Sequence, residues 1–258
     1  MKLNILVFLG FLTIVSSCKE AEFMEYQDED RIQFGPNNPD LIYRSDYETQ
    51  WKFQDTTKGY SFYFEKEEVT VDTLFFDLYT LGRVVDYDRP YKLVQTEEEG
   101  VKNAKAGIHY QAFDAPESKE LYVVEAGKAH VRVPIVLFRD ESLKDDPYIL
   151  SFKIQENEHF KLGAATNTWR KATVADKLIQ PPAWDAIGTQ YYWGAYSTVK
   201  HQFMIDASGL EWDQEVMASL AYDETTYFRA VFKKALTDYN SSHSEPLRDE
   251  NNQLVVFP

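Results

Sequence analysis

Val131-Arg-Val-Pro-Ile-Val-Leu-Phe138 is the stretch of this chain that indicates its fold most clearly. Apolar residues stand at every second position, which is the period of a strand with one buried face. They are Val131, Val133, Ile135 and Leu137. Pro134 lacks a backbone donor, so we expect this strand to lie at a sheet edge or to carry a bulge.

Similar short apolar segments precede and follow this strand. They are Ile32-Phe34, Tyr60-Phe64, Val69-Leu81, Tyr91-Gln95, Leu121-Val124, Ile149-Gln155 and Ala172-Leu178. Turn residues such as Gly35-Pro36, Gly82, Gly107 and Gly127 separate them. Several short strands with turns between them predict a mainly β protein, with an Ig-like β-sandwich over residues 31–179.

The pattern changes after Gln180-Pro181-Pro182, and residues 180–258 read as a smaller α-containing region. A short helix is predicted over residues 197–207, and a longer one follows Asp223 as its N-cap. Six apolar residues of the longer helix share one face. They are Phe228, Val231, Phe232, Ala235, Leu236 and Tyr239. We expect this face to dock on the sandwich, with residues 254–257 forming a closing strand.

The N-terminus has the layout of a secretory signal: a charged start, then an apolar run from Ile5 to Val15. The run is too short to span a bilayer, which needs about 20 residues. The string Val15-Ser-Ser-Cys18 resembles a bacterial lipobox. This implies removal of residues 1–17, lipidation of Cys18 and a tether over residues 18–30. The alternative is an ordinary signal peptide followed by a stray cysteine.

Behind the cysteine, Lys19-Glu-Ala-Glu22 resembles the signal that sends Bacteroidota lipoproteins to the outer face of the outer membrane. The alternative is a solvated tether, which short charged runs commonly form. We therefore expect the chain to contact a membrane through the lipid on Cys18 and to be exposed at the cell surface.

The formal net charge of −15 excludes nucleic acid as a partner, because the phosphates would repel the chain. Hydrophobic residues make up 44% of the sequence, which is enough to build a core. Cys18 is the only cysteine, so the chain forms no internal disulfide.

Motifs with catalytic spacing are missing from the sequence, including Gly-x-Ser-x-Gly, His-Glu-x-x-His and the P-loop. The five histidines are scattered, with no pair at helical ligand spacing. Acidic pairs such as Asp86 and Asp88 are too common in an acidic chain to indicate a glycoside hydrolase. We therefore expect no enzyme activity and no cofactor.

An acidic loop follows the strand that ends at Phe138. It contains Asp140, Glu141, Asp145 and Asp146. Calcium binds several oxygens at close range, so these residues are candidate metal ligands. EF-hand spacing is missing, and a solvated turn is the favoured interpretation.

An aromatic cluster follows the two prolines. Its members are Trp184, Tyr191, Tyr192, Trp193 and Tyr196. Aromatic faces can stack on sugars, so these residues are candidates for ligand binding. Core packing is the favoured alternative, because each ring would bury a large apolar area.

Three segments in order, Gly107-Ile-His109-Tyr110, Val123–Gly127 and Val131–Asp140, resemble the Calx-beta pattern. The resemblance implies an Ig-like sandwich in which loop acids bind calcium in some members. His109 stands where the pattern has aspartate, and this departure weakens the implied calcium site.

The whole chain resembles a family of uncharacterised Bacteroidota surface lipoproteins, domains of unknown function often found near starch-utilisation-type uptake systems. The segments that carry the resemblance are Asp88-Arg-Pro-Tyr91, Phe138-Arg139-Asp140, Asp176-Lys177-Leu178, Pro181-x-x-Trp184 and Gly194-x-Tyr196-Ser197-x-x-Lys200. The family has no established activity, so it supplies no catalytic residues.

Together these observations predict a non-catalytic accessory or binding lipoprotein that binds a glycan beside an outer-membrane uptake system. A structural or adhesive module with a protein partner is the alternative, and a glycoside hydrolase is the less favoured third interpretation.

Overall fold

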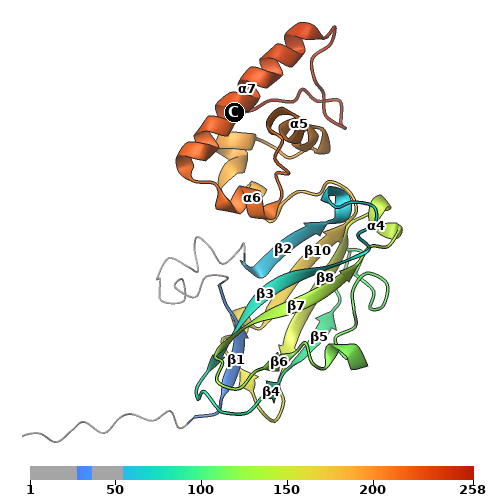
Figure 1. The fold of residues 1–258 in the computed structure, drawn as a ribbon. Coiled ribbons are helices and arrows are strands. Elements are labelled where there is room, and N and C mark those ends of the chain that lie inside the picture. Colours follow the sequence, from blue (N-terminus) through green and yellow to red (C-terminus); the bar gives the residue numbers. More distant parts are fainter. Residues whose placement is uncertain (1–27, 37–54) are drawn as a thin grey trace, which may run out of the picture.

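Two four-stranded sheets pack face to face in the computed structural model, which describes residues 28–36 and 55–258 (Figure 1). The first sheet has the order β7-β3-β1-β9. Its strands are β7 (His130–Phe138), β3 (Val71–Leu81), β1 (Arg31–Phe34) and β9 (Lys161–Leu162). β3 pairs antiparallel with β7 and β1, whereas β9 runs parallel to β1.

The second sheet has the order β2-β10-β8-β5. Its strands are β2 (Thr57–Ser61), β10 (Trp169–Ala175), β8 (Tyr148–Gln155) and β5 (Lys92–Thr96). A two-stranded ribbon of β4 (Arg89–Pro90) and β6 (Val123–Val124) lies at one end of the sandwich. Single turns of helix lie at α4 (Ser142–Asp145), Phe62–Phe64, Pro116–Ser118 and Ala165–Asn167.

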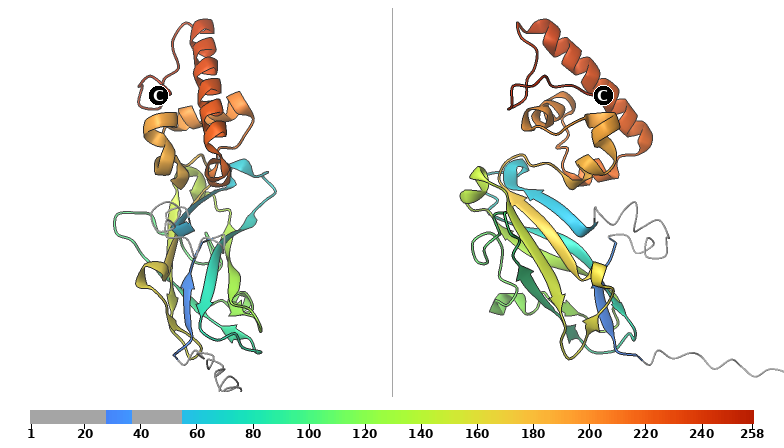
Figure 2. Two further views of the ribbon diagram at one scale, coloured as in Figure 1. Left: turned by 90° about the vertical axis from the view of Figure 1, so that its left-hand side faces the viewer. Right: turned by 180° about the vertical axis from the view of Figure 1, so that it is seen from behind.

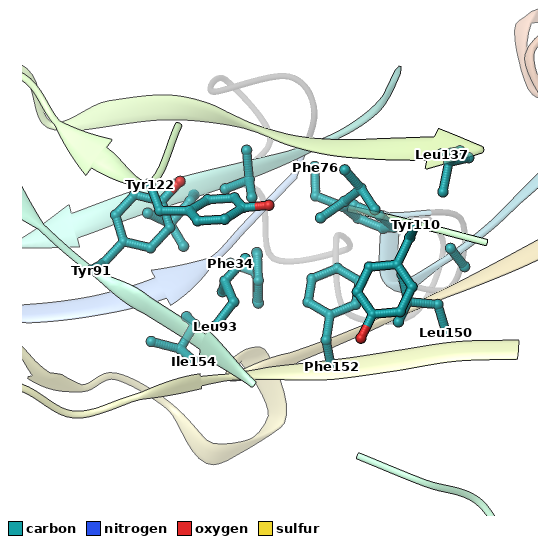
Figure 3. Close-up of a cluster of buried hydrophobic side chains, with 14 of the residues drawn as sticks. Phe34, Phe76, Tyr91, Leu93, Tyr110, Tyr122, Leu137, Leu150, Phe152 and Ile154 are labelled. Carbon is teal, nitrogen blue, oxygen red and sulfur yellow. The ribbon is translucent and has the colours of Figure 1, made fainter. Parts of the chain in front are cut away.

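The core between the sheets is formed by the residues at alternate positions of the strands. Val133, Ile135 and Leu137 of β7 are fully buried, as the period-two pattern predicts. Phe152 of β8 packs edge-on against Phe34 and Phe76 of the opposite sheet, at centroid distances of 5.8 and 5.4 Å (Figure 3). The predicted β-sandwich is therefore confirmed.

Pro134 lies on an edge strand, because β7 has β3 as its one sheet neighbour. The Tyr122 hydroxyl donates a hydrogen bond to the Pro134 carbonyl at 3.2 Å. The edge position predicted from the proline is therefore confirmed, and the strand tolerates a residue that cannot donate.

The C-terminal region is helical and sits at one end of the sandwich (Figures 1 and 2). It begins with a wide π-type helix (Trp184–Trp193) and continues with α5 (Thr198–Ser208), α6 (Gln214–Ser219) and α7 (Tyr222–Ser242). Ser197 accepts a hydrogen bond from the Lys200 backbone and Gly209 ends α5 with φ 73°, which confirms the predicted short helix.

This region has a hydrophobic core of its own, separate from that of the sandwich. Phe232 and Leu236 of α7 pack there with Trp193, Trp212 and Phe257. The prediction that this face of α7 packs on the sandwich is therefore wrong. The physical reason is that three buried tryptophans supply enough apolar surface for a second core.

Two smaller predictions in this region are also wrong. The N-cap of α7 is Ala221, two residues before the predicted cap Asp223, and the Glu224 carboxylate accepts a hydrogen bond from the Ala221 backbone. Residues 254–257 form no sheet strand: Val255 and Phe257 are buried against the helices, and Leu254 forms an isolated bridge with Arg248.

None of the described helices has both the length and the apolar composition needed to cross a bilayer. Cys18, the predicted lipidation site, and the predicted signal peptide lie outside the described residues.

Candidate functional site

The structure separates the five aromatic residues that were candidates for ligand binding. Trp184 and Trp193 are 0% and 3% exposed and belong to the helical core, so neither offers a ring face to a ligand. Tyr196 packs edge-on against Trp184 at 5.0 Å. Tyr192 is half-buried on the same core, and Tyr191 is 64% exposed. The five residues therefore do not form one exposed aromatic platform for a ligand, because Trp184 and Trp193 are buried in the core.

Lys200 explains why the aromatic segment takes this shape. Its buried Nζ donates to the carbonyls of Trp193 at 2.9 Å and Ala195 at 2.6 Å, on either side of Gly194. Gly194 has φ 70°, and a Cβ there would lie 3.2 Å from the lysine Nζ. Only glycine fits this left-handed position comfortably. The Gly194-x-Tyr196-Ser197-x-x-Lys200 segment therefore has a structural role: its hydrogen bonds stabilise the helical core.

Burial lowers the pKa of Lys200 to about 8, whereas a lysine in an unfolded chain titrates near about 10.4. Between these values the unfolded chain binds a proton that the folded chain does not, so stability rises with pH. From pH 8 to 9.5 we expect the free energy of unfolding of the helical region to rise by roughly 1–2 kcal/mol through Lys200. Urea titrations followed by tryptophan fluorescence measure this. Lys200→Met should abolish the rise, and an equal rise in that variant would contradict the assignment.

Other segments of the family resemblance also have structural roles. Arg139 forms a bidentate ion pair with Asp176: its Nε and Nη2 donate to the two carboxylate oxygens at 2.9 and 2.8 Å. This pair connects the end of β7 to the end of β10. Arg89 is 1% exposed, pairs with Asp30 at 3.2 Å and lies 4.6 Å above the Phe160 ring.

The four acids of the predicted calcium loop are held by different partners. Asp140 accepts from the Ser142 hydroxyl at 2.6 Å, Glu141 pairs with Lys144 at 2.9 Å, and Asp146 pairs with Lys102. The Asp145 carbonyl accepts from Lys177. Within the described residues, no three His, Cys, Asp or Glu side chains are grouped to hold a metal ion.

His109, the departure from the Calx-beta pattern, is buried beside this loop. Its Nδ1 accepts from the Lys105 backbone at 3.0 Å, so its Nε2 donates to the Ser142 hydroxyl at 2.9 Å. Burial lowers its pKa, which favours the neutral ring. The histidine therefore orders the start of α4.

A cleft of about 840 Å³ opens between the sandwich and the helical region. β2, the start of β3 and Arg132 of β7 form one wall, and α6 with the residues just before it forms the other. The Tyr63 hydroxyl spans the two regions with a 2.6 Å hydrogen bond to Gln202 of α5. Gln214 accepts from the Ala183 backbone at 2.8 Å, which fixes α6 to the start of the π-type helix.

Six carboxylates and two cationic side chains line this cleft, an excess of four negative charges. The carboxylates are Asp55, Glu65, Asp72, Glu211, Asp213 and Glu215, and the cations are Lys58 and Arg132. Burial raises the pKa of Glu211, and repulsion from Asp213 and Glu65 adds to the rise. Burial lowers the pKa of Lys58, although Asp77 and Asp55 oppose this.

Several of these groups are held in place by neighbours within their own wall. Lys58 donates to the Phe75 carbonyl at 2.7 Å, and the Tyr60 hydroxyl donates to Asp72. Arg132 lies 4.3 Å above the Phe75 ring. The cleft therefore presents one fixed acceptor, Asp72, and two fixed donors, Lys58 and Arg132, an arrangement suited to binding a ligand rich in hydroxyl groups.

His201 lines the back of the cleft and connects it to the helical core. It is 1% exposed, and its Nε2 donates to the Trp212 carbonyl at 3.0 Å. Burial lowers its pKa, so the ring is neutral and its role is structural.

A family model described as "Domain of unknown function (DUF4843)" matches residues 37–210. No curated protein is significantly similar to the chain. Among solved structures, a two-domain protein of unknown function from Bacteroides fragilis is 13% identical, with a TM-score of 0.32 over 58% of this chain and 46% of that one. A proposed carbohydrate-binding protein from Bacteroides ovatus is 10% identical, with a TM-score of 0.34 over 57% and 37%. The chain therefore spans less than half of each of these structures.

Proposed function

The chain belongs to the DUF4843 family of domains of unknown function, and we propose that it is a non-catalytic lipoprotein of the cell surface that binds a neutral glycan. It would serve as an accessory protein beside an outer-membrane nutrient uptake system. The observation that carries the proposal is the cleft between the sandwich and the helical region.

The size of the cleft suits a short oligosaccharide. Ligand sites in proteins commonly enclose about 300–1,000 Å³, and this cleft holds about 840 Å³. Its walls combine carboxylates with the rings of Tyr60, Phe64 and Phe75. Carboxylates accept two hydroxyl hydrogen bonds each, and aromatic faces pack on the apolar faces of sugar rings.

The charge of the cleft selects against acidic ligands. Six carboxylates face two cations there, and a uronic acid or sulfated sugar would be repelled by the excess negative charge. A neutral sugar is not repelled. Its hydroxyl groups donate hydrogen bonds to ionised carboxylates, and these bonds are stronger than hydrogen bonds to neutral acceptors. We therefore expect neutral polysaccharides to be preferred.

Retention on immobilised polysaccharides tests this function. The intact protein should be retained on at least one neutral polysaccharide and on no polyuronate. Glu211→Ala should weaken retention by more than about tenfold, because a hydrogen bond to a charged group contributes about 1.5–3 kcal/mol.

Glu245→Ala is the matched control, because Glu245 is exposed in the helical region and does not line the cleft. Equal loss in both variants, or no retention across a broad panel, would contradict glycan binding in the cleft.

The anchor is a separate part of the proposal and has a separate test. Replacing Cys18 by alanine should release the protein from the membranes of its native host, because a lipidated cysteine carries more than one acyl chain and anchors stably. Detergent partition measures the release. Protease added to intact cells should digest the wild-type protein. A membrane-bound Ala variant would refute the anchor, and full protection from protease would refute surface exposure.

A protein partner is the second candidate function, and three exposed tyrosines of the helical region favour it. Tyr191, Tyr222 and Tyr227 are 64%, 79% and 64% exposed. Tyrosine is enriched at protein interfaces. Co-purification of an outer-membrane protein that the Tyr222→Ala and Tyr227→Ala variants no longer bind, in the absence of glycan binding, would favour this function.

A further inference from the structure

The loop between β3 and β4, Gly82–Asp88, lies at the end of the sandwich remote from the helical region (Figures 1 and 2). Val84 is 58% exposed and Tyr87 is 53% exposed, and Leu81 at the end of β3 is 40% exposed. The loop and the strand end before it therefore expose three large apolar side chains within seven residues.

The base of this loop is held firmly. The Arg83 backbone donates to Asp30 at 3.0 Å, and the Gly127 backbone donates to the Val85 carbonyl at 2.8 Å. Asp88 accepts from the Ala126 backbone at 2.8 Å. The apolar tip is therefore presented by an ordered turn, so little conformational entropy is lost when a partner covers it.

Asp30 places this loop beside the start of the folded chain. Its carboxylate pairs with Arg89 at 3.2 Å and with Arg83 at 3.4 Å, directly before β1. Cys18 lies ten residues before Asp28, so the chain between them spans at most about 36 Å. A lipid on Cys18 would keep this end of the sandwich within that distance of the membrane.

We propose that the loop Gly82–Asp88, together with Leu81, rests on the lipid surface to which Cys18 tethers the chain. The sandwich then stands with the helical region and its cleft directed away from the membrane. Tyrosine suits the boundary between headgroups and acyl chains, because its ring is apolar and its hydroxyl is polar. This inference rests on the proposed anchor at Cys18.

Apolar contact, and not charge, holds the loop at the membrane. The loop carries Arg83 against Asp86 and Asp88, so its formal charge gives no attraction to anionic lipids. Zwitterionic phosphatidylcholine is therefore a sufficient probe, and its effect on the loop should persist at high salt.

The test uses the mature chain, residues 18–258, whose single cysteine is coupled through maleimide to a lipid in phosphatidylcholine vesicles. This supplies the anchor chemically, so the outcome does not depend on lipidation in the cell. Backbone hydrogen exchange of residues 81–88 should slow at least several-fold on vesicles compared with the free protein. Exchange of residues 243–253, in the helical region, should not change.

The variant Val84→Ser with Tyr87→Ser should lose this protection, and its unchanged exchange elsewhere would show that it folds. Val256→Ser is the matched control, because Val256 is 59% exposed in the helical region; it should keep the protection of the loop. Unchanged exchange of the loop on vesicles, or equal protection in the double variant, would overturn the inference. Neither result would bear on the anchor, which the Cys18→Ala experiment tests in cells.

Discussion

Replacing Trp212 by alanine is expected to lower the free energy of unfolding of the helical region by about 3–5 kcal/mol. The side chain is 0% exposed, and its ring lies 5.0 Å from both Phe228 and Phe232 and 5.2 Å from Trp193. Its indole also donates to the Ser208 hydroxyl at 2.7 Å. Truncation would leave a cavity at the centre of the second core.

The backbone of Trp212 makes this loss harder to offset. Its φ of 53° lies in the left-handed region, which costs a residue with a Cβ roughly 1–2 kcal/mol. Alanine keeps that strain and loses the packing that compensates for it. Thermal unfolding followed by tryptophan fluorescence should show a fall in Tm of more than about 12 °C for this region. Tyr222→Ala, at a site 79% exposed, is the control and should be nearly silent. A Trp212→Ala variant as stable as the control would mean that the second core does not hold the region together.

Replacing Phe152 by alanine is expected to destabilise the sandwich by about 3–5 kcal/mol. Phe152 is 0% exposed and packs against rings from three other segments: Phe34 at 5.8 Å, Phe76 at 5.4 Å and Phe113 at 5.4 Å. Far-UV circular dichroism of the strands in urea measures the change.

Phe152→Leu is the informative companion, because a leucine refills most of the volume and should cost less than about 1.5 kcal/mol. Equal losses in the two variants would mean that the aromatic edge contacts, and not the filled volume, stabilise this core.

The strands of the sandwich could be predicted because their apolar residues alternate. β7 is the clearest case, and its proline even indicated the sheet edge. β9 could not be predicted, because Lys161–Leu162 is too short to show a period. Phe62–Phe64 was predicted as strand and is a helical turn instead, because the Ser61 hydroxyl accepts from the Tyr63 backbone and bends the chain.

In the helical region, the sequence revealed which face of α7 is apolar but not what that face packs against. Trp193, Trp212 and Phe257 come from separate segments, so no local pattern showed that they meet. The same holds for the aromatic cluster: apolar spacing cannot distinguish a buried tryptophan from an exposed one. Lys200 holds the backbone on both sides of Gly194 by hydrogen bonds to two carbonyls, a contact that no local pattern showed.

The cleft was missed entirely by sequence reasoning. Lys58, Asp72, Arg132 and Glu211 lie far apart in the chain and form no motif. Lys58, Asp72 and Arg132 come together through the pairing and packing of the strands, and Glu211 joins them because the helical region lies at this end of the sandwich. In a chain this acidic, an excess of carboxylates carries no local signal that would single these out.

Hydrogen exchange with and without a retained neutral oligosaccharide would locate the bound ligand on the protein. We expect slower exchange in both walls of the cleft, residues 57–61 and 72–75 on the sandwich and residues 211–219 on the helical region. Exchange around Tyr191 and along the outer face of α7 should stay unchanged. Protection confined to those exposed tyrosines, with both walls unaffected, would contradict the assignment of the cleft as the binding site.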